Sequence, residues 1–66
     1  MTRVLLQFPQ ISERTTVPES TLRYWRHMGG GPPMFRLGRR LVAFEDELDA
    51  WIADQQTAAD AARRSA

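Results

Sequence analysis

The stretch VPESTLRYWRHM, residues 17–28, predicts a short amphipathic helix around which the rest of the chain is arranged. At about 100° per residue, the apolar Leu22 and Trp25 fall on one face of this helix. The opposite face carries polar and basic side chains: Ser20, Arg23, Tyr24 and His27. Hydroxyl, guanidinium, phenol and imidazole groups can hydrogen-bond to base edges and phosphates. The pattern therefore indicates the recognition helix of a DNA-binding domain.

A first helix is expected before it, from Phe8 to about Thr15. Phe8, Ile11 and Thr15 are spaced to share one face, and a proline at the second position is tolerated in a first helical turn. Gln7 would be the N-cap, although glutamine is a poor one. A link of about three residues leads to the helix that Pro18 opens, and two short helices so joined are typical of a helix-turn-helix.

A β-hairpin is expected at residues 34–44, MFRLGRRLVAF. It follows the run GGGPP, residues 29–33, which ends the second helix because glycine has no helix preference and proline lacks a backbone donor. Three arginines occupy its tip and outer face, where a wing would approach a phosphate backbone: Arg36 on the outer face, Arg39 and Arg40 at the tip. A hairpin that is only solvated is the alternative.

The register of this hairpin is predicted from its apolar residues. A three-residue loop, residues 38–40, pairs Leu37 with Leu41 and Phe35 with Ala43, so that the apolar side chains share one face. A two-residue loop would set Leu37 opposite an arginine. The three-residue loop is therefore expected.

The last predicted element is an amphipathic helix from about Glu45 to at least Gln56. Its acidic first turn suits the positive end of the helix dipole. Residues 57–66, TAADAARRSA, have high helix propensity, so we expect a tail that frays or continues past the domain. The apolar stripe of the last helix comprises Phe44, Leu48, Trp51, Ile52 and Gln55.

At the other end of the chain, residues 1–7 are expected to be an extended lead-in.

Composition indicates one domain, residues 1–66, with a small core. The absence of cysteine excludes a disulfide framework, and a single histidine cannot build a metal site alone. No apolar run approaches the length of a signal or membrane-spanning segment, so a cytoplasmic location is expected.

Charge is strongly segregated along the chain. Residues 1–44 hold seven arginines against two glutamates, whereas residues 45–66 hold six acids against two arginines, so +5 is followed by −4. All nine basic residues are arginine, which suits bidentate phosphate and guanine contacts but also fits a GC-rich coding bias. A basic head and an acidic tail predict head-to-tail association of neighbouring copies on DNA.

No catalytic or metal-binding arrangement is found among the polar residues. The carboxylates that begin the last helix lack a second ligand set, and Ser20 and Thr21 have no nearby base. Neither enzymatic activity nor a cofactor is therefore expected. Trp25 and Trp51 lie on apolar stripes and are expected in the core. Tyr24 lies off the stripe, where a DNA contact or a cap on the edge of the core are equal alternatives.

The order of these segments resembles the small winged helix-turn-helix domains of phage excisionases, or recombination directionality factors, which are relatives of the DNA-binding head of MerR-type regulators. The similarity covers about residues 4–53 and is greatest to the excisionases of mycobacteriophages. Three pieces carry it: STLRYW at 20–25, RLGRR at 36–40, and Leu48 with Ala50, Trp51 and Ile52.

The resemblance implies a mainly α fold with a small β-hairpin, in the order helix, helix, two-stranded wing, helix. It implies a protein that occupies repeated sites in a phage attachment region, bends the DNA and directs a phage integrase toward excision. In the major groove it would place Ser20, Thr21, Arg23 and Tyr24. Arg39 of the wing would reach the adjacent backbone or minor groove.

Two positions depart from the family pattern, and two other functions fit the sequence. Pro18 stands where serine or threonine is usual, and Val42 stands at an outward wing position that is often basic, which suggests an exposed apolar contact. At the core side of the second helix, Arg26 is placed to pair with Glu19 instead of DNA, while His27 could contact a phosphate.

The alternative functions that fit the sequence are a small MerR-like transcriptional regulator and a protein-interaction or antitoxin-like module.

Overall fold

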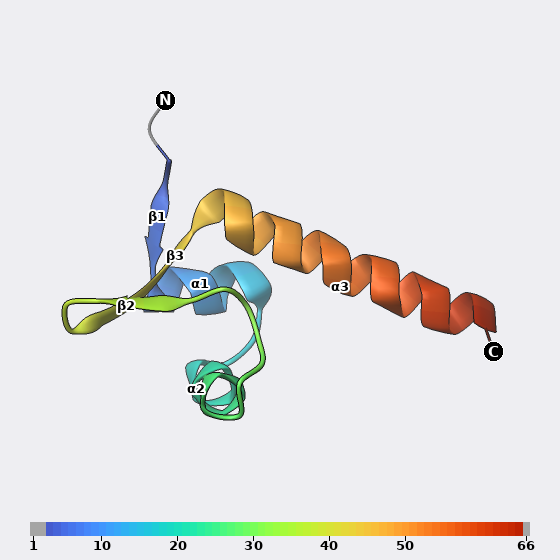
Figure 1. Ribbon diagram of the computed structural model, residues 1–66, viewed down its shortest axis with the longest axis horizontal. Helices are drawn as coiled ribbons and strands as arrows, with labels where there is room; N and C mark the ends of the chain where they lie inside the picture. Colours follow the sequence, from blue (N-terminus) through green and yellow to red (C-terminus); the bar gives the residue numbers. More distant parts are fainter. Residues whose placement is uncertain (1–2, 66) are drawn as a thin grey trace.

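The computed structural model describes residues 3–65, which form a mainly helical fold with a small three-stranded antiparallel sheet (Figure 1). Residues 1–2 of the expected lead-in and residue 66 of the expected tail lie outside the described residues. The elements in chain order are β1 (Leu5–Gln7), α1 (Phe8–Thr15), α2 (Glu19–His27), β2 (Phe35–Leu37), β3 (Arg40–Phe44) and α3 (Glu45–Ser65). The predicted succession of helix, helix, hairpin and helix is confirmed, with one additional strand.

The additional strand is β1, which pairs antiparallel with β3 and makes it the central strand. Leu6 lies opposite Ala43 in this pairing, and both side chains are buried. Val4, which precedes β1, is exposed. The predicted two-stranded hairpin is thus part of a three-stranded sheet, because β3 has a second edge whose backbone groups need partners and a lone hairpin is marginal in water.

The predicted three-residue loop of the hairpin is wrong. Leu37 pairs with Arg40, so β2 and β3 are joined by two residues, Gly38 and Arg39. Gly38 has a φ of +65° at the first central position, as in a type II′ turn, whose twist matches that of the strands. Leu37 did not need an apolar partner, because its side chain is 55% exposed. The apolar pair that reaches the core is formed across β1 and β3, between Leu6 and Ala43.

The same register corrects the expectation for Val42. Its side chain is only 4% exposed, so it is not a surface contact for another protein. Phe35 lies opposite Val42 in the sheet, and Phe44 lies two residues along the same strand face. The two phenyl rings approach to 5.6 Å between centroids on this face. Val42 is therefore buried on the side of the sheet that faces away from the core cluster.

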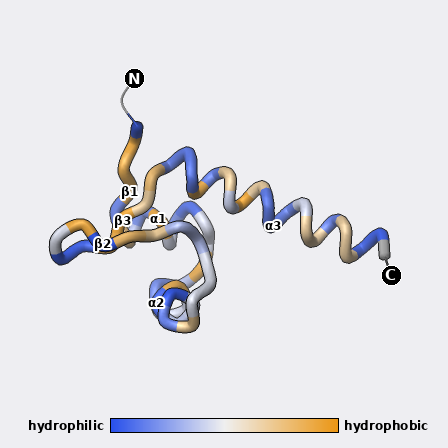
Figure 2. The backbone as a smooth tube through the Cα atoms, viewed as in Figure 1, coloured by the Kyte–Doolittle hydropathy of each residue, from blue (hydrophilic) through white to orange (hydrophobic). Residues whose placement is uncertain are grey.

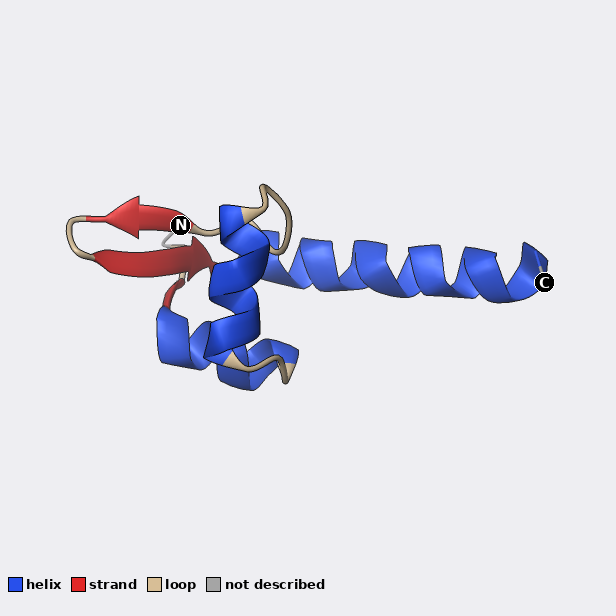
Figure 3. Ribbon diagram, turned by 90° about the horizontal axis from the view of Figure 1, so that it is seen from below, coloured by secondary structure: helices blue, strands red, loops and turns tan. Residues whose placement is uncertain are grey.

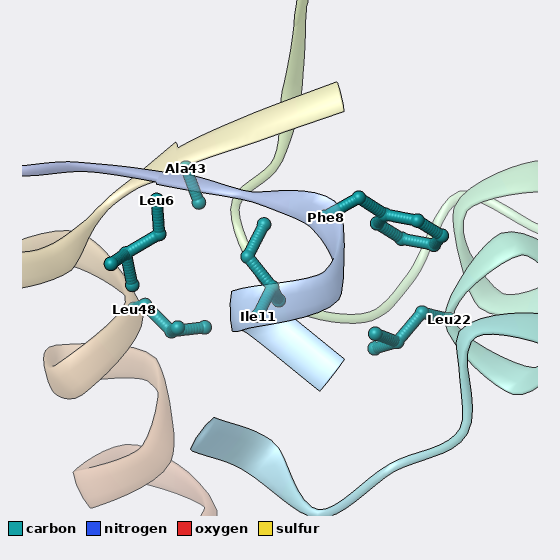
Figure 4. Close-up of a cluster of buried hydrophobic side chains, with 6 residues drawn as sticks. All are labelled: Leu6, Phe8, Ile11, Leu22, Ala43 and Leu48. Carbon is teal, nitrogen blue, oxygen red and sulfur yellow. The ribbon is translucent and has the colours of Figure 1, made fainter. Parts of the chain in front are cut away.

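The core is one small cluster to which every element except β2 contributes (Figure 4). Trp25 and Ile52 are half-buried and pack against it, as their apolar stripes predict. Trp51 is half-buried with its ring centroid 6.5 Å from that of Trp25. The cluster comprises Leu6, Phe8, Ile11, Leu22, Ala43 and Leu48.

The turn between α1 and α2 is held by hydrogen bonds within the turn itself. Ser12 Oγ donates to the carbonyl oxygen of Val17 at 2.6 Å. Thr16, the C-cap of α1, adopts the left-handed conformation with a φ of +59°. Gln7, a poor N-cap by its own side chain, is assisted by Gln10, whose Oε1 accepts the Gln7 backbone N–H at 2.8 Å. The Ser12 hydrogen bond thus ties α1 to the residue that precedes Pro18, the N-cap of α2.

Only the first part of α3 packs on the core. Leu48 is fully buried and Ile52 half-buried, whereas the side chains of residues 53–64 are exposed except for half-buried Asp60. The helix continues to Ser65 and projects away from the domain, opposite the hydrophilic hairpin tip (Figures 2 and 3). Of the two expectations for the tail, continuation past the domain is correct through residue 65. Within the described chain, no helix combines the length and apolarity needed to cross a membrane.

Candidate nucleic-acid interface

A cleft of about 440 Å³ lies between α2, the β2–β3 hairpin and the β1–α1 junction. Four guanidinium groups line it, and the only carboxylate among its lining residues is that of Glu19. Charge near the cleft is therefore strongly positive, which favours an anionic ligand. The lining residues are Gln7, Phe8, Pro9, Glu19, Arg23, Arg36, Arg39, Arg40 and Leu41.

Arg23 reaches this cleft from the α2 side. Its Nη2 lies 3.8 Å from Glu19 Oε1, one helical turn earlier, and its guanidinium carbon lies 5.0 Å from the centre of the Phe8 ring. The expectation that Glu19 pairs with Arg26 is wrong, because Arg23 stands one turn from Glu19 whereas Arg26 stands two turns away. Arg23 remains 67% exposed despite both contacts, so its donors are accessible to a ligand.

The hairpin brings three guanidinium groups to the other side of the cleft. Arg40 belongs to β3, not to the loop, and its Nη1 donates to Gln7 Oε1 at 3.1 Å. Arg39 occupies the turn. Arg36 pairs with Leu41 and so lies on the sheet face that also carries Leu41, not on the outer face where it was expected. Both Arg36 and Leu41 line the cleft.

The remaining recognition-helix residues lie along the exposed side of α2. Ser20, Tyr24 and His27 are exposed, as the helical wheel predicts, and Thr21 is half-buried. Tyr24 is 61% exposed, so a role as a cap over the core is not supported. The exposed side of α2 therefore presents hydroxyl, phenol and imidazole groups next to the cleft that contains Arg23.

The acidic start of α3 is neutralised by two arginines of the same chain. Arg3 Nη2 lies 2.9 Å from Asp46 Oδ1 and 3.1 Å from Glu47 Oε2. Arg14 bridges Glu45 and Asp49, with both nitrogen–oxygen distances 2.9 Å. Asp60 pairs with Arg63, so five of the six acids that suggested head-to-tail association already have partners, which reduces the support for that association from charge alone.

These ion pairs also explain where positive charge remains. The other five arginines of residues 1–44 all belong to α2 or the hairpin: Arg23, Arg26, Arg36, Arg39 and Arg40. Hydrogen bonds from Arg3 lower the pKa of the Asp46 carboxyl below its ordinary value, and the same bonds raise the pKa of the Arg3 guanidinium. Arg3 also lies over the ring of Phe44, the last residue of β3, 3.8 Å from its centre, and so ties the segment before β1 to the point where β3 meets α3.

A second groove, of about 290 Å³, lies between the end of α2 and α3. Trp25, Trp51 and Gln55 line it together with the loop glycines Gly30 and Gly31. Met28 also lines it and is 65% exposed. Among residues 3–65 no group of three or more histidine, aspartate or glutamate side chains is arranged to hold a metal ion.

Sequence reasoning identified four arginines of the cleft but missed its third side, which is formed by Gln7 and Phe8. Their role depends on β1 pairing with β3, for which a three-residue strand leaves no periodic pattern in the sequence. Glu19 was expected to pair with Arg26, and its place in the cleft beside Arg23 was not predicted. Comparison of the chain with protein-family models, curated proteins and solved structures finds no match in any of the three.

Proposed function

We propose that this chain is a winged helix-turn-helix protein that binds double-stranded DNA. The observation that carries the proposal is the cleft in which Arg23 of α2 faces the same space as Arg36, Arg39 and Arg40 of the hairpin. Guanidinium groups bind phosphates bidentately and are not deprotonated at physiological pH. Four of them around one cleft, against the single carboxylate of Glu19, favour a polyanion that runs between helix and hairpin.

The proposed orientation places α2 in the major groove and the hairpin against the neighbouring backbone. An α-helix with its side chains is about 10–12 Å across, close to the width of about 12 Å of the major groove of B-DNA. In this orientation Ser20, Thr21, Arg23 and Tyr24 reach base edges and nearby phosphates. His27 reaches a phosphate at the end of the helix, and Arg39 reaches the backbone or minor groove on the wing side.

For the biological role, we propose an excisionase that bends DNA at a phage attachment region and directs a phage integrase toward excision. The support for this role is the resemblance carried by residues 20–25, 36–40 and 48–52. Self-association on tandem sites belongs to the same proposal. A MerR-like regulator would use the same cleft, so DNA binding and excision need separate tests.

Footprinting across a phage attachment region, followed by an in vitro excision reaction with the cognate integrase, tests both levels. Contacts to about four to six phosphates predict a slope of log K against log salt near −4 to −5. Protection of tandem sites with stimulated excision supports the full proposal. Site-specific protection without stimulation supports the regulator instead. Duplex binding that is absent, or insensitive to salt, overturns the proposal and favours a protein-interaction module.

A further inference from the structure

Two adjacent residues at the β1–α1 junction contact the two arms of the cleft. Gln7, the last residue of β1, accepts a hydrogen bond from Arg40 of the hairpin. Phe8, the first residue of α1, lies beneath the guanidinium of Arg23 of α2. All four side chains line the same cleft. The junction thus touches both a helix arginine and a hairpin arginine.

The backbone of Gln7 is fixed from two directions. On the strand side it pairs with Val42 of β3, whose side chain is buried. On the helix side its N–H donates to Gln10 Oε1. Its side chain points to the same face of the sheet as Val42 and hence as Arg40, two residues before Val42 in the same strand. From this anchored backbone its amide oxygen accepts a hydrogen bond from Arg40 Nη1 at 3.1 Å.

The ring of Phe8 is fixed as firmly, because Phe8 is a member of the core cluster and only 7% exposed. A guanidinium within about 6 Å of a ring centre is attracted by the ring's electron-rich face. Arg23 satisfies this condition at 5.0 Å. Glu19 also restrains Arg23, but at 3.8 Å and on an exposed helix face this contact is a loose one.

We infer that the β1–α1 junction is a positioning element of the DNA-binding cleft, in which Gln7 sets the place of Arg40 and Phe8 sets the place of Arg23. The inference rests on the proposed function. Arginine loses much rotamer freedom when it is immobilised on a ligand, so side chains held beforehand bind at lower entropic cost. Because one rigid junction holds both groups, it also fixes their separation, and with it the spacing of phosphates that the cleft accepts.

The test separates the two arms with one apolar substitution at each junction residue. Gln7→Met keeps the length of the side chain but removes the acceptor, and Phe8→Leu keeps an apolar core residue but removes the ring. Each is expected to weaken binding to mixed-sequence duplex DNA by roughly three- to tenfold, the range for losing one preordered side chain. Phe8→Tyr, which retains the ring face, is expected to preserve affinity and serves as the conservative control.

Double-mutant cycles show whether each residue acts through its own arginine. Gln7→Met is expected to have no further effect on affinity when Arg40 is already alanine, and Phe8→Leu none when Arg23 is already alanine. The crossed pairs, Gln7→Met with Arg23→Ala and Phe8→Leu with Arg40→Ala, are expected to be additive. The inference is overturned if the effects on affinity are additive when Gln7→Met is combined with Arg40→Ala and Phe8→Leu with Arg23→Ala. It is also overturned if these two combinations show the same coupling as the crossed pairs.

A measurement without DNA keeps the inference distinct from the proposed function. NMR relaxation of the arginine Nε–Hε groups in the DNA-free protein should show a lower order parameter for Arg40 alone in Gln7→Met, and for Arg23 alone in Phe8→Leu. A change in both arginines, or in neither, overturns the positioning role. If the parent fails to bind duplex DNA, the proposed function falls, and the relaxation data still decide whether the junction holds the two arginines.

Discussion

Arg23 on α2 and Arg39 at the turn of the β2–β3 hairpin line the same cleft, although they belong to different elements. The loop at residues 29–33 brings this about, because it reverses the chain after α2 and returns the hairpin beside the two short helices (Figures 1 and 3). A duplex that touches one of these guanidinium groups can therefore touch the other. The two residues are the most direct test of the proposed interface.

Arg23→Ala and Arg39→Ala are each expected to weaken binding to duplex DNA and to make the slope of log K against log salt less negative by about 1, since each removes one phosphate or base contact. The Arg39 variant is expected to weaken binding about equally to all sequences. The Arg23 variant is expected to relax sequence preference as well, because the proposed orientation assigns the base contacts to α2. Fluorescence anisotropy titrations at several salt concentrations measure both quantities.

Arg63→Ala is the matched control for these variants. It removes the same charge from the projecting part of α3, where Arg63 pairs with Asp60 of its own helix. Its affinity and salt slope are expected to remain near those of the parent. Equal losses in all three variants would mean that net charge, rather than the cleft, determines binding.

The loop after α2 offers a prediction about stability. Gly29 and Gly31 have φ values of +84° and +87°, so alanine is strained at either position. An added Cβ at Gly29 meets nothing within 4 Å, whereas at Gly31 it would lie 3.0 Å from the Cβ of Trp25. Gly31→Ala is therefore expected to lower the free energy of unfolding by about 2–3 kcal/mol, and Gly29→Ala by about 1 kcal/mol.

Urea unfolding followed by tryptophan fluorescence measures this difference, because Trp25 and Trp51 lie next to the loop. The informative quantity is the difference in free energy of unfolding between Gly31→Ala and Gly29→Ala, since the backbone strain is common to both. Equal losses would show that Trp25 moves aside without cost, and the close approach of the loop to α2 would then have no role in stability.

Local signals in the sequence were sufficient for the helices and for the location of the hairpin. The predicted bounds of α1 match the structure, because an apolar spacing and a first-turn proline mark its ends. The GGGPP run ends α2 within a residue of the prediction. The outward face of α2 was likewise correct, since its helical period alone determines which side chains point away from Leu22.

Features that depend on pairing between distant segments could not be predicted in this way. The strand β1 has three residues and no alternation strong enough to indicate its partner β3. Because β1 was not predicted, the register of the hairpin was argued from the expectation that Leu37 lies on an apolar face. The structure leaves Leu37 exposed. For the same reason the contact between Gln7 and Arg40 was missed. The ion pairs of Arg3 and Arg14 with α3 join residues more than thirty positions apart and leave no local pattern.

The ion pair between Arg3 and Asp46 predicts a pH dependence of stability. Arg3 lowers the pKa of Asp46 in the folded protein below its ordinary value of 3.8, so the charged carboxylate stabilises the fold above that pH. The contribution is lost as the pH falls through the lower, folded-state pKa. The parent is therefore expected to be slightly more stable than Asp46→Asn at neutral pH and no more stable in strong acid. The difference is small and is reduced by salt, because both groups are exposed.

Asp54→Asn supplies the comparison, because it removes the same charge from the same helix away from Arg3. Urea midpoints for the parent and both variants, measured from neutral pH into acid, provide the test. Only the difference between the parent and Asp46→Asn should decline on acidification. A difference that persists unchanged below pH 3.8 would contradict the assignment of this pKa shift to Arg3.

The turn between α1 and α2 stores strain that a single substitution should release. Thr16 has a φ of +59°, where an L-residue is destabilised by about 1–2 kcal/mol and a β-branched one is especially rare. Its hydroxyl bonds only to the adjacent carbonyl of Thr15 on an exposed surface. Thr16→Gly removes the steric cost, while the added freedom of the unfolded chain costs about 0.4–1 kcal/mol. A net gain of about 0.5–1 kcal/mol in the free energy of unfolding is expected.

Thr16→Ala separates strain from the loss of the hydroxyl, because alanine keeps the Cβ that is unfavourable at this φ. It should give no gain in urea unfolding, whereas Thr16→Gly should raise the midpoint without changing the denaturant slope. Affinity for duplex DNA should be unchanged in both, since Thr16 does not line the cleft between α2 and the hairpin. A stable glycine variant with weakened binding would instead mean that the stiffness of this turn, and so the angle at which α2 is presented, is part of how the duplex is bound.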